Sequence, residues 1–511
     1  MVEDASSAYI ELLGLMKDIY LYNSAWSAVT WESRTSLPPG SFSQRAEVQG
    51  LLGKLYHRIS SNPEFGKLLD SVMNDESYDS YDYIHKRNIH LIKREYEALI
   101  NTPEELLSHY MKQISITSRE WEKAVKKNDW KVFEPEFSKL VDIAMELGEK
   151  LMDVVGVSNP YDFYFNEYEE GMRADLISKI FTDLTKSIVP MVKKYTPSIS
   201  NLRTDFINRS VDREAQRRLV DELAELVGYD TKSENATGKL GETMHPFSIG
   251  RYDDTRVAVR FDENDLLFTY RATLHEFGHS LYNKNLNREW MYQPIGMEGG
   301  FGVHESQAKF LEYMIGFSPE FIEFFFPKLN SITGDVFSDV TPMEFVKVVN
   351  VVRPGPLRTK ADELTFTLHI IIRFEIERDL FAGKLDVSDI PAIWNELYEK
   401  YLGVEVPNDA EGALQDVQWS SGSFGSFPCH TLGNIIVAQL VEKMAKDIPD
   451  WKDQIGEGDL KKSISWMTDN VHKMGRLYDT PELIEHVTGR KMSAKPFLSY
   501  LDQKFKTLSS L

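Results

Sequence analysis

The stretch His275-Glu276-Phe277-Gly278-His279 places two histidines four residues apart, with a glutamate directly after the first. On an α-helix, side chains at i and i+4 lie on one face, so both imidazoles can reach a single metal ion. The glutamate would then stand beside a water molecule on that ion. The pattern is typical of zinc peptidases, and it requires a helix across these five residues.

The residues before the motif predict that helix. The run 266–274 has apolar side chains at helical spacing, and Asn264 or Asp265 can cap its start. Gly278 costs about 1 kcal/mol inside a helix relative to alanine, which is tolerable where something approaches the backbone closely. An amphipathic helix with ordinary, metal-free histidines is the competing interpretation, and this context weakens it.

A catalytic zinc needs a third protein ligand and an open position for water. The helical pattern at 303–313 offers two neighbours, His304 and Glu305, which point about 100° apart on a helix and therefore compete for the metal. We favour Glu305, because two histidines, one glutamate and water form an established hydrolytic set. His304 as the ligand and a salt-bridged surface role for Glu305 remain as alternatives.

These residues predict metal-assisted hydrolysis. A bound ion lowers the pKa of water towards about 7 and polarises the scissile carbonyl. Glu276 would accept the proton of the water and deliver it to the leaving amine.

The composition is that of a globular protein. The chain has 511 residues, of which 42% are hydrophobic and 12% aromatic, so it can bury a sizeable core. No apolar run approaches the roughly 18 residues of a membrane span, and the acidic first four residues lack the features of a signal peptide. The single cysteine, Cys429, excludes an internal disulfide framework and all-cysteine zinc sites. These features predict a cytoplasmic protein.

The charge narrows the choice of partners. A formal net charge of −21 argues against nucleic acid and anionic membranes, because both would repel the chain. A solvated acidic surface accounts for most of this charge, which also attracts cations such as the metal.

Helix signals dominate the rest of the chain. Thr102-Pro103-Glu104-Glu105 and Thr341-Pro342-Met343-Glu344 each combine a capping residue, an early proline and a glutamate. Weaker starts of this kind stand at 62–63, 318–319 and 480–481. Helical periodicity is clearest at 9–22, 104–127, 174–194 and 362–381.

Strand signals are few, and the clearest, at 254–261, directly precedes the motif helix. An extended peptide could pair along the edge of such a strand. We therefore expect a mainly α fold with a small β-sheet beside the metal helix.

Several further segments follow one another in the order of a known family's motifs. They are 31–46 (W-D…R-A in the family), His245-Pro246-Phe247 (H-P-F), His304-Glu305-Ser306-Gln307 (H-E-S-Q), 357–363 (I-R-x-x-A-D-E) and 412–419 (G-x-x-Q-D-x-H-W). With them the chain resembles the thermostable carboxypeptidase (Taq) family of metallocarboxypeptidases over nearly its whole length. The resemblance implies a single helical domain, 1–511, with a deep active-site groove. It also implies a homodimer that removes C-terminal residues of peptides with broad specificity and holds one zinc or cobalt ion per subunit.

The resemblance also implies roles for individual residues. His275, His279 and Glu305 would be the metal ligands, and Glu276 the general base. Arg358 would hold the terminal carboxylate of the substrate, and His245 and Arg256 would lie near the substrate. A guanidinium suits this task, because it binds a carboxylate through two parallel hydrogen bonds. From the residues alone, Arg358 cannot be chosen over the other arginines, and a surface ion pair with Asp362 and Glu363 is the interpretation we would favour for it.

Four positions depart from the family's pattern. Ala258 replaces the threonine of D-x-R-x-T, Gln418 replaces the histidine of Q-D-x-H-W, and Ser426 and His430 stand where tyrosines are usual. None is a predicted metal ligand, so we expect an active hydrolase. The loss of aromatic hydroxyls near the carboxylate pocket could alter its specificity or weaken its transition-state contacts. An endo-acting oligopeptidase with the same metal site, and a binding protein without turnover, are the two rival functions. Two further residues are expected to be packing residues, namely Cys429 as a small buried side chain and His369 inside a helix.

Overall fold

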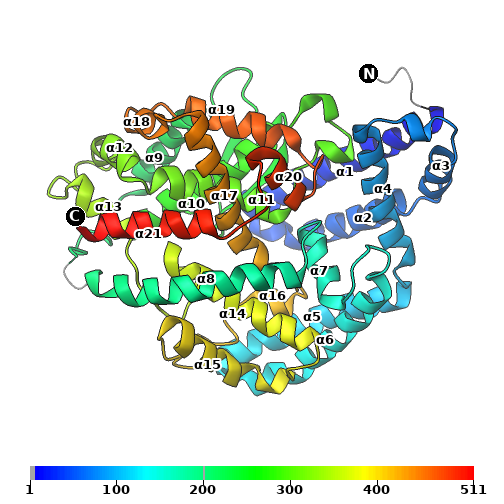
Figure 1. The fold of residues 1–511 in the computed structure, drawn as a ribbon, viewed down its shortest axis with the longest axis horizontal. Helices are drawn as coiled ribbons and strands as arrows, with labels where there is room; N and C mark the ends of the chain where they lie inside the picture. The colour runs from blue at the N-terminus through cyan, green and yellow to red at the C-terminus, as the bar shows by residue number, and fades with distance from the viewer. Residues whose placement is uncertain (1–5, 200–201, 511) are drawn as a thin grey trace.

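The computed structural model describes residues 6–199 and 202–510, and helices dominate it (Figure 1). The helices before the sheet are α1 (Ser7–Thr35), α2 (Phe42–Ser60), α3 (Glu64–Met73), α4 (Tyr83–Asn101), α5 (Glu104–Lys127), α6 (Trp130–Leu151), α7 (Pro160–Tyr168), α8 (Ala174–Tyr195) and α9 (Arg213–Leu226). The predicted helices at 9–22, 104–127 and 174–194 are therefore present.

The second half of the described chain is also helical. Its helices are α10 (Leu266–Lys284), α11 (Phe301–Lys309), α12 (Pro319–Ile332), α13 (Pro342–Val349), α14 (Glu363–Phe381), α15 (Ile390–Leu402), α16 (Val417–Ser420), α17 (Phe427–Asp447), α18 (Trp451–Gly456), α19 (Lys461–Asn470), α20 (Thr480–Thr488) and α21 (Lys495–Ser510). A π-helical segment, η6 (Phe310–Gly316), continues α11, and a short 3₁₀ turn, η7 (Arg358–Lys360), precedes α14.

The predicted helix starts fare differently. Thr341 caps α13 in a complete capping box with Glu344. The prediction is wrong for Thr102, because its hydroxyl donates to the carbonyl of Ala98 (2.7 Å) and so ends α4, leaving Pro103 at the start of α5 without a side-chain cap. At the helix start predicted at 480–481, which is that of α20, the cap is Asp479, one residue earlier than predicted.

A three-stranded sheet lies beside α10. Its strands β1 (Gly238–Glu242), β2 (Phe247–Arg251) and β3 (Asp254–Val259) have the order β1-β3-β2, with β3 parallel to β1 and antiparallel to β2. The strand predicted at 254–261 is thus the central one. The prediction that its edge could receive a peptide is wrong, because both of its sides are already paired, and the outer edges belong to β1 and β2.

The two faces of the sheet have different neighbours. In the register of β2 and β3, Ser248 lies opposite Val257, and Ile249 lies opposite Arg256. Helix α10 packs on both strands, while α1 packs on β2, where the rings of Trp31 and Phe247 lie 5.6 Å apart. The sheet is therefore held between α10 and α1.

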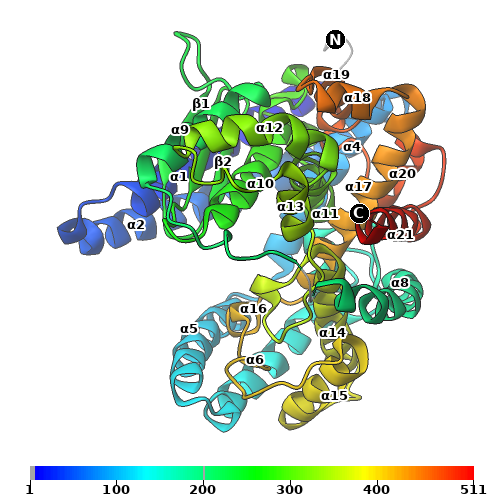
Figure 2. The same cartoon turned by 90° about the vertical axis from the view of Figure 1, so that its left-hand side faces the viewer.

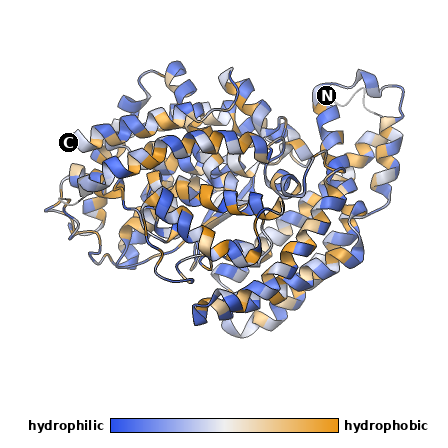
Figure 3. Ribbon diagram, turned by 60° about the horizontal axis from the view of Figure 1, so that its bottom comes forward, coloured by the Kyte–Doolittle hydropathy of each residue, from blue (hydrophilic) through white to orange (hydrophobic). Residues whose placement is uncertain are grey.

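The hydrophobic core is helical. One large buried cluster connects elements from α5 to α21, and a smaller one joins α1, α3 and α4. Figure 2 shows α5, α6, α14, α15 and α16 grouped below the helices that carry the metal motif. Most helices carry hydrophobic residues along one side and hydrophilic residues along the other (Figure 3). Within the described ranges, no helix is both long and apolar enough to cross a membrane.

Candidate metal centre

Helix α10 carries the two histidines of the motif on one face, as the spacing predicts. Asp265 caps the helix by accepting a hydrogen bond from the backbone N–H of Phe268 (3.0 Å). The Nε2 atoms of His275 and His279 lie 3.2 Å apart. Two imidazole nitrogens this close can share one ion.

Glu305 of α11 completes the set. Its Oε1 lies 4.0 Å from Nε2 of His275, and its Oε2 lies 3.8 Å from Nε2 of His279. The donor atoms of the three residues are all within 4.8 Å of one another, the only group of this kind in the part of the chain that the structure describes. The donors fit a divalent ion such as zinc, which binds two histidines and one carboxylate and leaves a position open.

His304 makes contacts with Asn283 and His279 instead of joining the three donors. Its Nε2 pairs with Oδ1 of Asn283 (3.0 Å), its ring stacks on that of His279 at 4.2 Å, and its carbonyl oxygen contacts Nδ1 of His279 (3.1 Å). This geometry therefore supports Glu305, and not His304, as the third ligand.

Two glycines let the helices of the site approach one another. A Cβ atom on Gly278 of α10 would lie 2.5 Å from Cα of Ala308 in α11. A Cβ atom on Gly433 of α17 would lie 2.6 Å from Cγ of Glu305. Real Cβ contacts are never this short, so both positions need glycine, and the close approach expected at Gly278 is confirmed.

The outer nitrogen of each histidine is fixed. Nδ1 of His275 lies 2.9 Å from Oε2 of Glu312, and Nδ1 of His279 faces the carbonyl of His304. Because both partners are acceptors, each Nδ1 carries the proton, and each Nε2 lone pair is left for a metal. Burial also holds the pKa of His279 well below its usual value, which keeps this ring in the neutral, metal-binding form.

A buried ion-pair network surrounds these ligands. Lys309 lies 3.3 Å from Glu305 and 3.0 Å from Glu312, and Arg271 lies 2.8 Å from Glu312. Burial alone would raise the pKa of Glu312, but Lys309 and Arg271 reverse this and hold it far below its usual range. Glu312 therefore stays ionised beside His275 over the whole physiological pH range.

Glu276 is buried beside the first histidine of the motif. It lies on α10 next to His275, is 8% exposed, and faces Ser248 of β2. Burial raises the pKa of its carboxyl group, and His275 and Ser248 only partly oppose this. A carboxylate with a raised pKa holds a transferred proton more firmly, which suits proton shuttling near neutral pH.

The start of α11 is held by a buried carboxylate. Glu169, which follows α7, accepts hydrogen bonds from the N–H of Gly302 and the hydroxyl of Thr480. Burial raises the pKa of Glu169 to about 7, against the effect of these donors. Glu169 thereby connects α7 and α20 to the helix that carries Glu305.

Arg358 is anchored, although not by the partners considered from the sequence. Its Nε donates to Oδ1 of Asp416 (2.8 Å), its backbone N–H donates to Gln415 (2.9 Å), and its guanidinium lies 5.6 Å from the centre of the Phe427 ring. Among the described residues, neither Nη atom has a hydrogen-bond partner. The alternative ion pair with Asp362 and Glu363 is wrong: Asp362 instead caps α14.

The first turn of α17 connects Arg358 to the metal site. Phe427 packs against Arg358, and His430, three residues later, places Nδ1 3.7 Å from Oε2 of Glu305. Residues three apart on a helix lie on one face. The guanidinium and the candidate ligands are therefore joined by a single helical turn.

Among the described residues, neither His245 nor Arg256 has a hydrogen bond or ion pair with the metal residues. His245 is exposed in the loop between β1 and β2. Arg256 lies in β3 beside Asp254, with a 2.6 Å ion pair, and with Tyr20 and Ser24 of α1 it lines a narrow pocket. Their predicted role near the substrate stays a prediction.

The departures from the family pattern occupy different surroundings. Ala258 is buried in β3, Oε1 of Gln418 is buried without a hydrogen-bond partner, and Ser426 donates to the carbonyl of Ser423 (2.7 Å). Only His430 contacts a candidate ligand. Cys429 is buried, and burial raises the pKa of its thiol well above the usual value, in line with a packing residue.

His369 is packed inside α14, as predicted. It is buried, and its Nδ1 lies 2.8 Å from the hydroxyl of Tyr398.

Four residues around the candidate metal site were not predicted from the sequence, namely Glu312, Lys309, Arg271 and Glu169. The spacing held a weak signal for two of them, since Lys309 and Glu312 follow Glu305 by four and seven residues and therefore share its helix face.

The fold and the three converging donors define a metallopeptidase of the helical H-E-x-x-H class. More particularly, the chain belongs to the Carboxypeptidase Taq (M32) metallopeptidase family, whose sequence profile matches residues 11–505.

The chain is 32% identical to Carboxypeptidase 1 of Bacillus subtilis (strain 168) over 500 residues, which is 98% of each chain. It is 31% identical to Thermostable carboxypeptidase 1 of Thermus thermophilus over 509 residues, 98% of this chain and 99% of the relative. The crystal structure of the M32 carboxypeptidase from Deinococcus radiodurans R1 has a TM-score of 0.93 at 30% identity, covering 99% of this chain and 100% of that one. The chain is thus a metallocarboxypeptidase, and its mainly helical fold with a small sheet is confirmed.

Proposed function

We propose that this metallocarboxypeptidase hydrolyses the last peptide bond of peptides with a free C-terminus, with broad specificity. One divalent ion would be held by His275, His279 and Glu305. The observation that carries the proposal is the convergence of their donor atoms within 4.8 Å. Zinc or cobalt suits two imidazoles and one carboxylate with a position left open. When bound, such an ion supplies Lewis acidity, which polarises the scissile carbonyl and acidifies water.

Glu276 is the proposed general base. Its carboxylate takes a proton from the attacking water and returns it to the nitrogen of the leaving amine. The support is its burial beside His275, which raises its pKa and so favours a protonated intermediate state. The side chain of Ser248 in β2 hydrogen-bonds to this carboxylate and partly opposes the rise in its pKa.

Arg358 is the proposed contact for the substrate's α-carboxylate. An exopeptidase must distinguish a free carboxylate from an internal amide, and a guanidinium does this by charge and by paired hydrogen bonds. Asp416 fixes Nε of Arg358, which leaves the two Nη groups for a ligand. His245 and Arg256 are proposed as more distant contacts along the peptide.

A pair of peptides tests this function. The free peptide should be shortened by one residue at a time, whereas its C-terminally amidated form should resist cleavage. Arg358→Met should raise KM for the free peptide about tenfold or more, because a charge-assisted contact is lost. Arg353→Met, at an exposed arginine nearby, is the matched control and should leave KM unchanged.

The amidated peptide also separates the two rival functions. Equal cleavage of both peptides would favour the endo-acting oligopeptidase, since internal bonds need no free carboxylate. Binding of the peptide without any product would favour a protein that has lost turnover. The presence of Glu276 beside the metal residues argues against that second rival, because binding alone has no use for a base.

Two broader properties are proposed with this function. We propose a homodimer, and α2 supports it with an apolar side that is exposed to solvent and includes Val48, Leu51 and Leu55. Sedimentation should then give twice the mass of one chain, and Leu51→Lys should favour the monomer. We also propose a cytoplasmic location, with the lone Cys429 kept reduced.

A further inference from the structure

A cleft of about 760 Å³ lies away from the candidate metal ligands. Its walls are α21, α17, α18, the start of α12, part of η6 and the segment 490–493. Figure 1 shows α21 at the surface, with α17 beside it and α18 above it. Sites for small organic ligands have volumes of roughly 300–1,000 Å³, so this cleft is large enough to hold one.

The cleft is cationic although the whole chain carries a net charge of −21. Five basic side chains line it, against two carboxylates. They are Lys452, Arg490, Lys491, Lys495 and Lys504, against Glu320 and Glu442. A concentration of positive charge on an acidic protein directs small anions to this place.

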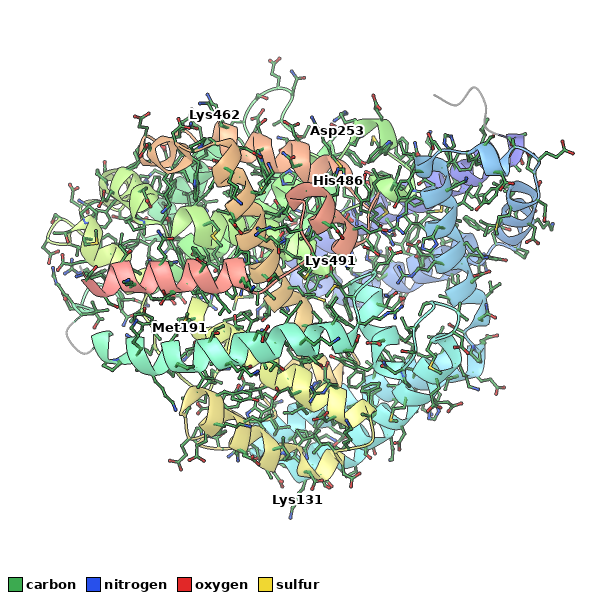
Figure 4. All side chains as sticks on the ribbon, viewed as in Figure 1. Lys131, Met191, Asp253, Lys462, His486 and Lys491 are labelled. Carbon is green, nitrogen blue, oxygen red and sulfur yellow. The ribbon has the colours of Figure 1, made fainter. Side chains whose placement is uncertain are left out.

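Three of the five basic groups are neutralised by carboxylates. The pairs are Lys452 with Glu320 (3.1 Å), Arg490 with Glu442 (2.6 Å) and Lys504 with Glu363 (2.5 Å). The ammonium groups of the other two, Lys491 and Lys495, have no hydrogen bond or ion pair among residues 6–199 and 202–510. Lys491 lies in the segment between α20 and α21 (Figure 4), and Lys495 is the first residue of α21. The positive end of the α21 dipole adds to their charge.

Part of the lining of the cleft is apolar. Met314 of η6, Val441 and Ala445 of α17, and Leu508 of α21 line it together with the ring of Trp451, which is 8% exposed. A ligand that fills the cleft would therefore remove hydrocarbon surface from water on this side, which is favourable in proportion to the area buried.

We propose that this cleft binds a small organic anion with an apolar body, such as a medium-chain carboxylate, at a site separate from the metal centre. The carboxylate lies between Lys491 and Lys495, and the hydrocarbon lies against the wall of α17. An inorganic anion would leave that wall wet, and a neutral hydrocarbon would leave both ammonium groups without a partner. An amphiphilic anion satisfies both halves of the cleft, and its binding does not depend on the peptidase reaction.

Calorimetric titration of the full-length protein with octanoate and with octanamide tests the proposal. The two ligands share one hydrocarbon chain and differ in charge, so octanoate should bind more tightly. In the double variant Lys491→Glu/Lys495→Glu, octanoate should bind about tenfold or more weakly, because two attractive charges become repulsive. The affinity of octanamide should stay the same.

Two further variants complete the test. Ala445→Trp should block both ligands by filling the cleft, whereas Lys506→Glu, on α21 but outside the cleft, should bind octanoate like the unaltered protein. Peptidase activity in all four proteins reports that they are folded. The proposal is overturned if octanoate does not bind, if octanamide binds equally well, or if the charge-reversed double variant keeps its affinity.

Discussion

Oε2 of Glu312 lies 2.9 Å from Nδ1 of His275, on the side of the ring opposite the proposed metal position. Glu312 is buried and ionised, held by Lys309 and Arg271. A carboxylate in this place orients the imidazole and makes its Nε2 a stronger donor. The affinity of the site for metal should therefore depend on a residue that cannot touch the ion.

Glu312→Gln should weaken zinc binding about 10- to 100-fold, the usual effect of losing such a partner. The dissociation constant can be measured by competition with a chromophoric chelator. Glu323→Gln, at an exposed glutamate of α12, is the control and should bind zinc as before. Equal zinc affinity in both variants would show that Glu312 does not strengthen zinc binding by His275.

Glu276→Gln should abolish peptide hydrolysis and leave the metal content near normal. Glutamine keeps the size of the side chain but cannot accept the proton. Product formation and bound metal should be measured on the same sample. Full activity in this variant would exclude Glu276 as the base.

The buried Glu169 should make stability depend on pH. Its pKa is about 7 in the folded protein against 4.5 as the usual value, so the folded state binds this proton more tightly than the unfolded state. The free energy of unfolding should therefore fall as the pH rises from about 4.5 to about 7, and this contribution should be constant above that. Glu169→Gln should lack this fall.

Urea unfolding of both proteins at several pH values from 4.5 to 8 measures the effect. As the pH rises from 4.5 to 7, the free energy of unfolding of Glu169→Gln should increase relative to that of the unaltered protein. Parallel stability curves would contradict the raised pKa.

Gly278→Ala should destabilise the protein by about 2 kcal/mol or more, because the new Cβ overlaps the backbone of α11. Helix propensity alone predicts the opposite sign, a gain of up to about 1 kcal/mol. Gly14→Ala in the exposed part of α1, where no atom lies within 4 Å of an added Cβ, should show that gain. Urea unfolding of the two variants gives both values, and a stabilised Gly278→Ala protein would be inconsistent with the close packing of α10 on α11.

The parts of the fold that could be predicted are those set by local sequence. Asp265, the helix it caps and the i,i+4 spacing of His275 and His279 are local, and the structure has all of them. Thr102 failed as a cap because the same hydroxyl could bond to the preceding helix instead, which local pattern does not decide. The central place of β3 was not predictable either, since β1 and β2 have weak strand signals and their pairing is set by tertiary packing.

The candidate site likewise has some features that local sequence predicts and others that it does not. The three candidate ligands follow from motif spacing, whereas the salt bridge from Arg358 to Asp416 joins residues 58 apart in sequence, and Glu169 reaches α11 across more than a hundred residues. Such contacts depend on how helices pack, and no pattern in one segment reveals them. That 1–511 form one domain, and that the roles of Arg358, His245 and Arg256 are those proposed, stay predictions.

Metal stoichiometry tests the central claim most directly. After loading with zinc or cobalt and removal of free ions, the protein should hold one ion per chain, measured by elemental analysis. His275→Ala/His279→Ala should hold none and remain folded, as judged by its circular dichroism. An unaltered protein without stoichiometric metal, or a double variant that keeps its ion, would contradict the account.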